Sequence, residues 1–345
     1  MLTVLGTAAA GNIGEAARGC EWLCALAGGA AGAVFFAAAG LFRARCGADS
    51  FYEGLCRCFG SGAGRLLSMA AGLLFLRFGA HDLAVMGKFV SANLLEETPY
   101  LISAGALAGA AAFAVRKGER TLARWSEVML PPVLAMFLLA LCLALPEMRF
   151  TELRFFRDWR LMADGTLDFA LLPFCGSLCC SVVLFRTGQG GESRRGIWGA
   201  GAAGLLLAML YAANTALLGR SVLGNFNFPT YHALRVIGLS SLEMRLESLL
   251  MLPLVLVGFL RIAMLLLAAV RGLERAAAKS NPGRWVRWLP LPVSAGALLL
   301  SRLLYQNQSE ILHAGRILRF FAAGLGLLTV LAAIIAAIRF PARKQ

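Results

Sequence analysis

Long apolar stretches, separated by short segments rich in arginine, are the feature that most constrains the fold of this chain. A helix of about 20 apolar residues can cross the hydrocarbon core of a bilayer, and the sequence holds about ten such stretches. Of the 345 residues, 59% are hydrophobic and 15% are charged, against about 45–50% and about 25% in soluble domains. We therefore predict an all-α, polytopic membrane protein. A soluble enzyme, a disordered chain and a disulfide-stapled secreted domain are excluded.

The expected spans form a single integral membrane domain over residues 1–345. They lie near residues 1–17, 22–42, 66–95, 99–115, 125–145, 167–185, 197–218, 242–270, 288–305 and 312–338, with a re-entrant segment at 226–240. Ten spans divide into repeat one (1–146), a connecting loop (147–166), repeat two (167–339) and a short cytoplasmic tail (340–345). Because each repeat has five spans, the two must insert in opposite orientations, as in many secondary transporters.

The net charge of +14 has two interpretations, a nucleic-acid partner or the cytoplasmic excess of a membrane protein. The distribution decides between them. The connections at 43–65, 116–124, 186–195, 271–287 and 339–345 hold 19 Lys and Arg residues, against seven at position 18 and in 149–160 and 220–235. We infer that both ends are cytoplasmic and that no nucleic acid is bound.

Spans one and six are interrupted at corresponding positions of the two repeats. Interruptions so placed point to a binding site, because unwound backbone leaves N–H and C=O groups for a ligand. Close packing of small residues is the alternative interpretation. The candidate ligand-binding residues are Gly11, Asn12, Gly14, Pro173, Phe174, Gly176 and Ser177.

Charged side chains inside a span are costly and are therefore paired or functional. His81 and Asp82 in the third span are candidates for a structural ion pair, or for a ligand or proton-relay role. Arg245 and Glu247 at the start of the eighth span are candidates for bracing or gating. Asn214 in the seventh span is expected to form an interhelical hydrogen bond.

Catalytic and metal-binding patterns are not found in the sequence. The three histidines fall in different segments, and the nine cysteines lack zinc-site spacing. We expect buried free thiols, no metal, no cofactor and no enzymatic activity.

Several short motifs resemble, in order and spacing, those of the spore germination permeases. Residues 93–99 (Asn-Leu-Leu-Glu-Glu-Thr-Pro) look like the family's entry to span four, and 118–124 resembles its Gly-to-Arg opening of span five. Residues 228–230 (Phe-Pro-Thr) and 245–248 (Arg-Leu-Glu-Ser) are similar to a Trp-Pro-Thr … Arg-Phe-Glu-Ser run, with Phe228 in place of the tryptophan. Trp22 stands where the family has a tryptophan opening span two.

This resemblance implies a B-type membrane subunit of a germinant receptor, in the amino acid–polyamine–organocation superfamily, with a LeuT-like fold. It further implies A-type and C-type subunits as partners, a small-molecule germinant and a place in the spore inner membrane of an endospore-forming bacterium. Relative to the family, the chain begins inside span one, so we expect a truncated first helix or a misassigned start codon.

Three functions remain open on the sequence. The first is a subunit that senses a small nutrient, an amino acid above all, and triggers germination. The second is an amino acid or polyamine transporter coupled to H⁺ or Na⁺. The third is a scaffold subunit that binds no ligand.

Overall fold

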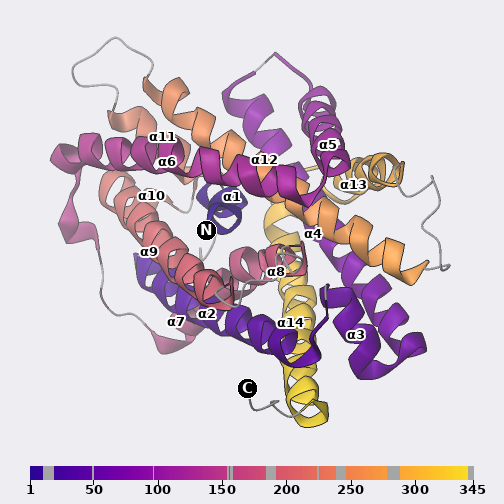
Figure 1. Ribbon diagram of the computed structural model, residues 1–345. Coiled ribbons are helices and arrows are strands. Elements are labelled where there is room, and N and C mark those ends of the chain that lie inside the picture. Colours follow the sequence, from indigo (N-terminus) through magenta and orange to yellow (C-terminus); the bar gives the residue numbers. More distant parts are fainter. Residues whose placement is uncertain are drawn as a thin grey trace.

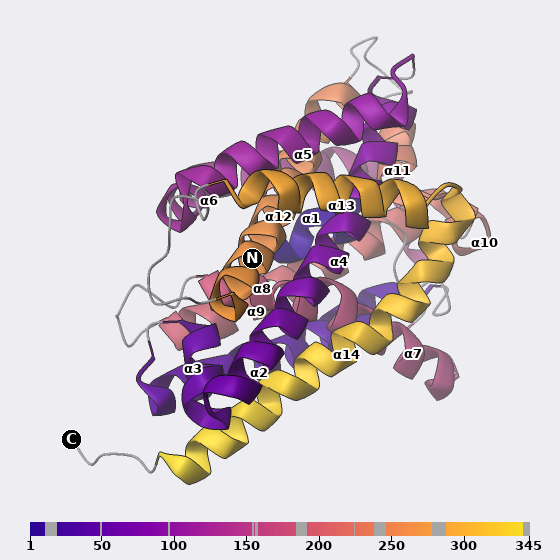
Figure 2. The ribbon, with the colours of Figure 1, turned by 90° about the vertical axis from the view of Figure 1, so that its right-hand side faces the viewer.

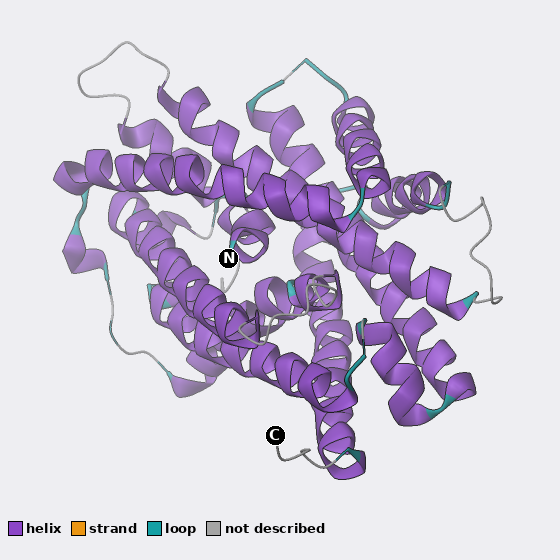
Figure 3. Cartoon of the chain, in the orientation of Figure 1, coloured by secondary structure: helices purple, strands orange, loops and turns teal. Residues whose placement is uncertain are grey.

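The described part of the chain is helical in the computed structural model and contains no strand (Figure 3). The structure describes residues 1–10, 19–48, 50–95, 97–153, 155, 158–183, 192–223, 225–237, 246–277 and 288–340. The all-α prediction is therefore confirmed for this part of the chain.

The helices vary from short segments of four residues to long ones of more than 30. They are α1 (Leu2–Ala10), α2 (Glu21–Cys46), α3 (Phe51–Phe59), α4 (Ser61–Asn93), α5 (Tyr100–Lys117), α6 (Glu119–Ala144), α7 (Trp159–Phe169), the π-helix η4 (Ala170–Cys175), α8 (Leu178–Val183), α9 (Glu192–Leu218), α10 (Arg220–Leu223), α11 (Pro229–Ile237), α12 (Leu246–Ala276), α13 (Pro290–Leu304) and α14 (Gln308–Arg339). Two 3₁₀ turns, η2 (Leu145–Glu147) and η3 (Phe150–Glu152), follow α6.

Among the described residues, seven helical segments are long and apolar enough to cross a membrane. They lie in α2, α4, α6, α7–α8, α9, α12 and α14. The other three predicted spans correspond to shorter or less apolar helices. α1 has nine residues, α13 has 15, and α5 is rich in Ala and Gly and ends in Arg116 and Lys117. The structure thus supports a multi-pass membrane protein, with seven clear spans within the described ranges.

The short helix α1 lies in the middle of the bundle, surrounded by the longer helices (Figure 1). It packs against α12, which itself lies along α4, while α2 lies along α9. Figure 2 shows α14 running along one side of this arrangement. The backbones of α2 and α9 approach closely because glycines face one another, and a Cβ added to Gly29 would lie 2.8 Å from the Cα of Gly204.

Capping side chains begin two of the helices, and a glycine ends a third. The hydroxyl of Ser50 accepts a hydrogen bond from the N–H of Glu53 at 3.1 Å and caps α3. Asn307 and Glu310 form a capping box at the start of α14, with 3.0 Å between the Asn307 nitrogen and a Glu310 oxygen. Gly47 ends α2 with φ of 56°, a left-handed conformation that favours glycine.

Hydrogen bonds between helices include the one expected for span seven. The amide of Asn214 in α9 donates to the hydroxyl of Thr230 in α11 at 3.0 Å, and both residues are buried. This bond ties the short helix α11 to the bundle.

Candidate functional site

The sixth predicted span is interrupted by the π-helix η4, which separates α7 from α8. Pro173 lies inside η4 and has no N–H to donate, so the regular hydrogen-bond ladder cannot continue through it. The N–H of Ser177 donates to the carbonyl of Pro173 at 3.2 Å and to that of Phe174 at 3.1 Å. The Ser177 hydroxyl donates to the Pro173 carbonyl at 2.6 Å. The break predicted at residues 173–177 therefore begins in a π-helix, and the N–H groups of Gly176 and Ser177 that follow are hydrogen-bonded to carbonyl oxygens of the break.

Opposite this break, a charged pair is buried between α4 and α12. The Nε of Arg261 in α12 donates to Oδ2 of Asp82 in α4 at 2.5 Å, and each side chain is 2% exposed. Two charges removed from water in this way remain ionised only when further polar groups satisfy them.

The rest of the Arg261 guanidinium is satisfied by oxygens from α1 and from the break. Its Nη1 lies 2.7 Å from the carbonyl oxygen of Thr3, 2.9 Å from that of Pro173 and 3.1 Å from the Ser177 hydroxyl. Its Nη2 lies 3.0 Å from the carbonyl oxygen of Leu172. One side chain thus joins α1, α4, η4 and α12 in the middle of the bundle.

Two glycines provide the space that the guanidinium fills. A Cβ on Gly6 in α1 would lie 2.5 Å from the Cδ of Arg261, and a Cβ on Gly176 would lie 2.5 Å from Nη2. Real Cβ atoms do not approach other atoms this closely, so any larger residue would force Arg261 to move. The need for glycine at these two positions comes from this contact.

A second polar cluster lies on α4, beside the ion pair. Arg77 donates to the hydroxyl of Tyr305, which follows α13, and its guanidinium carbon lies 5.1 Å from the centre of the Tyr305 ring. The Nδ1 of His81 lies 3.2 Å from the same hydroxyl. His81 and Asp82 are adjacent in sequence but face different partners, as expected for neighbouring residues of a helix.

The structure brings some of the predicted site residues together and leaves others untested. Asp82, Pro173 and Ser177 meet at Arg261, and Gly176 lies against it. Phe174 is buried on the other side of η4, where its ring lies against Gly32 of α2. The predicted residues that lie outside the described part of the chain are Gly11, Asn12, Gly14 and Arg245, and the side chain of Glu247 lies outside it as well.

The sequence analysis did not select Arg261, the residue that organises this site. A signal was present, because Arg261 is a single charge within a long apolar stretch of α12. A charge so placed indicates a partner or a function. Its partner Asp82 is 179 positions away, so the pairing itself could not be read from local spacing.

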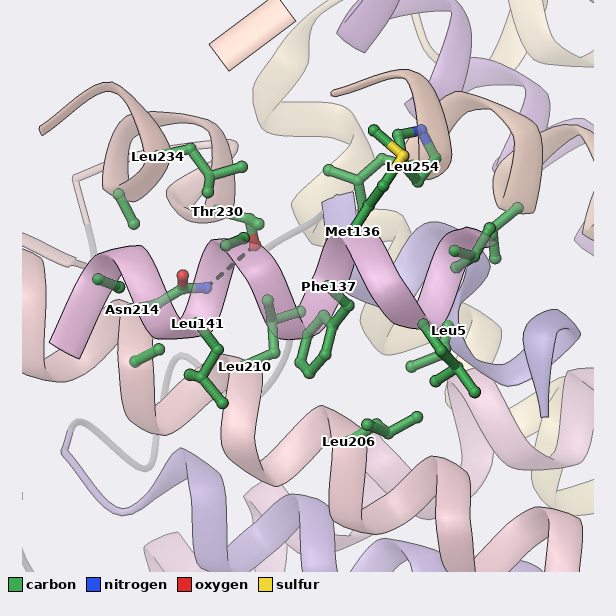
Figure 4. A pocket seen from close by; sticks show the side chains of 18 of the residues that line it. Leu5, Met136, Phe137, Leu141, Leu206, Leu210, Asn214, Thr230, Leu234 and Leu254 are labelled. Atoms are coloured by element: carbon green, nitrogen blue, oxygen red, sulfur yellow. Dashed lines mark hydrogen bonds between the residues drawn. The ribbon is translucent and has the colours of Figure 1, made fainter. Parts of the chain in front are cut away.

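Two cavities lie near the site. One, of about 80 Å³, lies between α6, α9, α11 and α12 and is almost wholly apolar (Figure 4). Asn214 and Thr230 line it and are hydrogen-bonded to each other, and Leu5 of α1 lies at another part of its wall. The other, of about 650 Å³, is lined by residues of α1, α2, α6, α8, α9 and α12, including Thr3. Within the part of the chain that is described, no cluster of three or more His, Cys, Asp or Glu residues could hold a metal.

A comparison with known protein families identifies the family of the chain. The profile of the spore permease family, described as spore germination protein, matches residues 1–311. The chain belongs to this family. The family is a permease and receptor type and not an enzyme type, and membership identifies the chain as a germination-related, multi-pass membrane protein of an endospore former.

A relative with a spore germination name gives the same indication. The chain is 25% identical over 261 residues to spore germination protein KB of Bacillus subtilis strain 168. The match covers 68% of this chain and 64% of that protein, so the chain spans less than two thirds of the length of this relative.

Proposed function

We propose that the chain is the B-type membrane subunit of a spore germinant receptor, and that it senses an amino acid at the meeting point of α1, η4, α4 and α12. The observation that carries the proposal is the buried Asp82–Arg261 pair, which faces a broken helix in a member of a spore germination family. A binding site near the middle of the membrane, at broken helices, is the usual arrangement in secondary transporters.

The proposed mechanism follows from how this site is closed. The N–H groups of Gly176 and Ser177 are used within the break, and Arg261 joins the break to α4. An amino acid carboxylate can be held by these N–H groups, or by Arg261, only after the site opens. Binding would thus shift the balance between two packings of the helices. We propose that A-type and C-type subunits in the spore inner membrane contact the helices and respond to this change in packing.

The proposal includes ten spans in two inverted repeats, with α1, α5 and α13 completing the seven clear spans. This topology predicts that both termini face the cytoplasm. Attachment of a reporter enzyme or a thiol label to each terminus and to the 147–166 loop tests it. A reporter or label signal that places either terminus on the outer side of the membrane would contradict the topology.

Two pairs of matched substitutions test the location of the site in spores that express each variant in place of the native gene. Ser177→Ala removes a hydroxyl that accepts from Arg261, while Ser68→Ala removes a buried hydroxyl that donates 2.7 Å to a carbonyl four residues back, away from the site. Gly176→Ala adds a methyl against Arg261, while Gly109→Ala adds one where nothing lies within 4 Å.

The expected result is that the two site variants need more amino acid to germinate, as followed by the fall in optical density, while the two control variants behave as the native protein. Deletion of the gene should abolish germination by at least one amino acid. Unchanged germination after deletion, together with amino acid uptake by proteoliposomes of the purified protein, would support the transporter instead. Unchanged germination without uptake would leave the scaffold role.

A further inference from the structure

Five oxygen atoms accept hydrogen bonds from the Arg261 guanidinium. They comprise one carboxylate oxygen of Asp82, one hydroxyl oxygen and three backbone carbonyl oxygens, contributed by α1, α4 and the break. We refer to these five oxygens as the acceptor cage. Its formal charge is −1, and it faces a side chain that is only 2% exposed. Such a set of oxygens is complementary to a cation and would be costly to leave without one.

The shape of the acceptor cage matches a planar cation. Its oxygens contact all three nitrogens of the guanidinium at 2.5–3.1 Å. The planar fork of a guanidinium presents five N–H donors in fixed directions, whereas an ammonium group is a compact point charge with three. Gly6 and Gly176 lie against Arg261 with no room for a methyl group. The charge, the contact with all three nitrogens and the lack of space therefore favour the same chemical class.

We propose that the acceptor cage is a binding site for a small guanidinium cation, and that the chain fills it with its own Arg261 as a tethered ligand. The tethered cation holds α1, α4, α12 and the broken helix together. The site can open only when Arg261 leaves the cage or moves with the oxygens that surround it. The cage is a property of the folded chain and does not depend on whether the protein senses an amino acid.

The test is to remove the tethered ligand and to supply it from solution. Arg261→Ala lacks the side chain beyond Cβ, and the ethylguanidinium ion contains the missing atoms. The purified variant in detergent should melt at a lower temperature than the native protein, and millimolar ethylguanidinium should raise that temperature by at least about 2 °C. The native protein should not respond, because its cage is already filled.

Four controls show whether the response is specific to a cation in the cage. Ethylurea has a similar shape without the charge and should not stabilise Arg261→Ala, and sodium chloride at the same concentration should not either. Arg319→Ala removes an arginine that pairs with Asp168 at 2.8 Å but is 22% exposed, and this variant should not respond to ethylguanidinium. The double variant Arg261→Ala with Asp82→Asn should lose the response. Equal stabilisation by ethylurea or sodium, a response in the double variant, or no response of folded Arg261→Ala would overturn the proposal.

A second comparison decides the question if Arg261→Ala does not fold. Arg261→Lys keeps a positive charge in the cage, whereas Arg261→Gln has a shorter polar side chain without the charge. The proposal requires the lysine variant to melt at a clearly higher temperature than the glutamine variant. Equal melting temperatures, or a more stable glutamine variant, would show that the cage does not need a cation.

Discussion

Replacement of Asp82 by Asn should destabilise the protein far more than the same change at any exposed carboxylate. The substitution keeps the size of the side chain and removes its charge, so the Arg261 guanidinium stays buried without a counter-ion. At an effective dielectric constant of about 20, two unit charges about 4 Å apart attract by about 4 kcal/mol. Loss of one partner of a buried pair costs about 3–5 kcal/mol. Because both side chains are 2% exposed and their atoms approach to 2.5 Å, we expect a loss in this range.

The assay is the free energy of unfolding in mixed micelles, measured by titration with denaturing detergent. Asp168→Asn is the matched control, because Asp168 pairs with Arg319 in α14 at 2.8 Å with side chains that are 16% and 22% exposed. This pair is half-buried, so its loss should cost more than the about 1 kcal/mol or less of an exposed pair but less than the loss of the fully buried Asp82–Arg261 pair. The double variant Asp82→Asn with Arg261→Met removes both charges from this site and should recover part of the loss.

Two results would refute this reasoning. One is a cost for Asp82→Asn that does not exceed the cost for Asp168→Asn. The other is strict additivity of the Asp82 and Arg261 changes, because residues in one ion pair must show a coupling energy.

Three further predictions concern other parts of the molecule. Gly32→Ala should destabilise the protein by about 1–3 kcal/mol in the same titration, because the new methyl would overlap the ring of Phe174; an equal effect of Gly109→Ala would contradict this. Tyr305→Phe should cost about 1–3 kcal/mol, because its hydroxyl bridges two side chains of α4, and a change within error would show that the bridge contributes nothing. In α11, burial, and secondarily a nearby positive charge, lowers the pKa of His232 below its ordinary value of 6.5. The unfolded chain therefore takes up the proton first, so this contribution to stability is full above about pH 6.5 and decreases as the pH falls. His232→Gln should flatten the dependence of the unfolding midpoint on pH between about 7 and 5, and an unchanged slope would refute this assignment.

Hydropathy and charge were sufficient to predict the class of protein, because the bilayer imposes a length and a composition on each span. The helical character and the break at Pro173 followed from local chemistry. The number of clear spans could not be predicted from local chemistry. α13 and α1 are too short and α5 is not apolar enough to count by themselves, so their role depends on the helices around them.

Part of the candidate site could likewise be predicted from the sequence, and part depends on the tertiary structure. Asp82 stands out in the sequence because a carboxylate in a membrane span needs a partner. The sequence could not supply that partner, because Arg261 lies 179 positions away on another helix, and only the packing of α4 against α12 brings the two together. The sequence also led us to expect N–H and C=O groups available to a ligand at the break, and in the fold two of its carbonyl oxygens accept from the guanidinium of Arg261. The sequence by itself determined that this is a helical membrane protein with a costly charge in span three. The tertiary structure decided which cation neutralises that charge, because the energy of a buried charge depends on the atoms within a few ångströms of it and not on its neighbours along the chain.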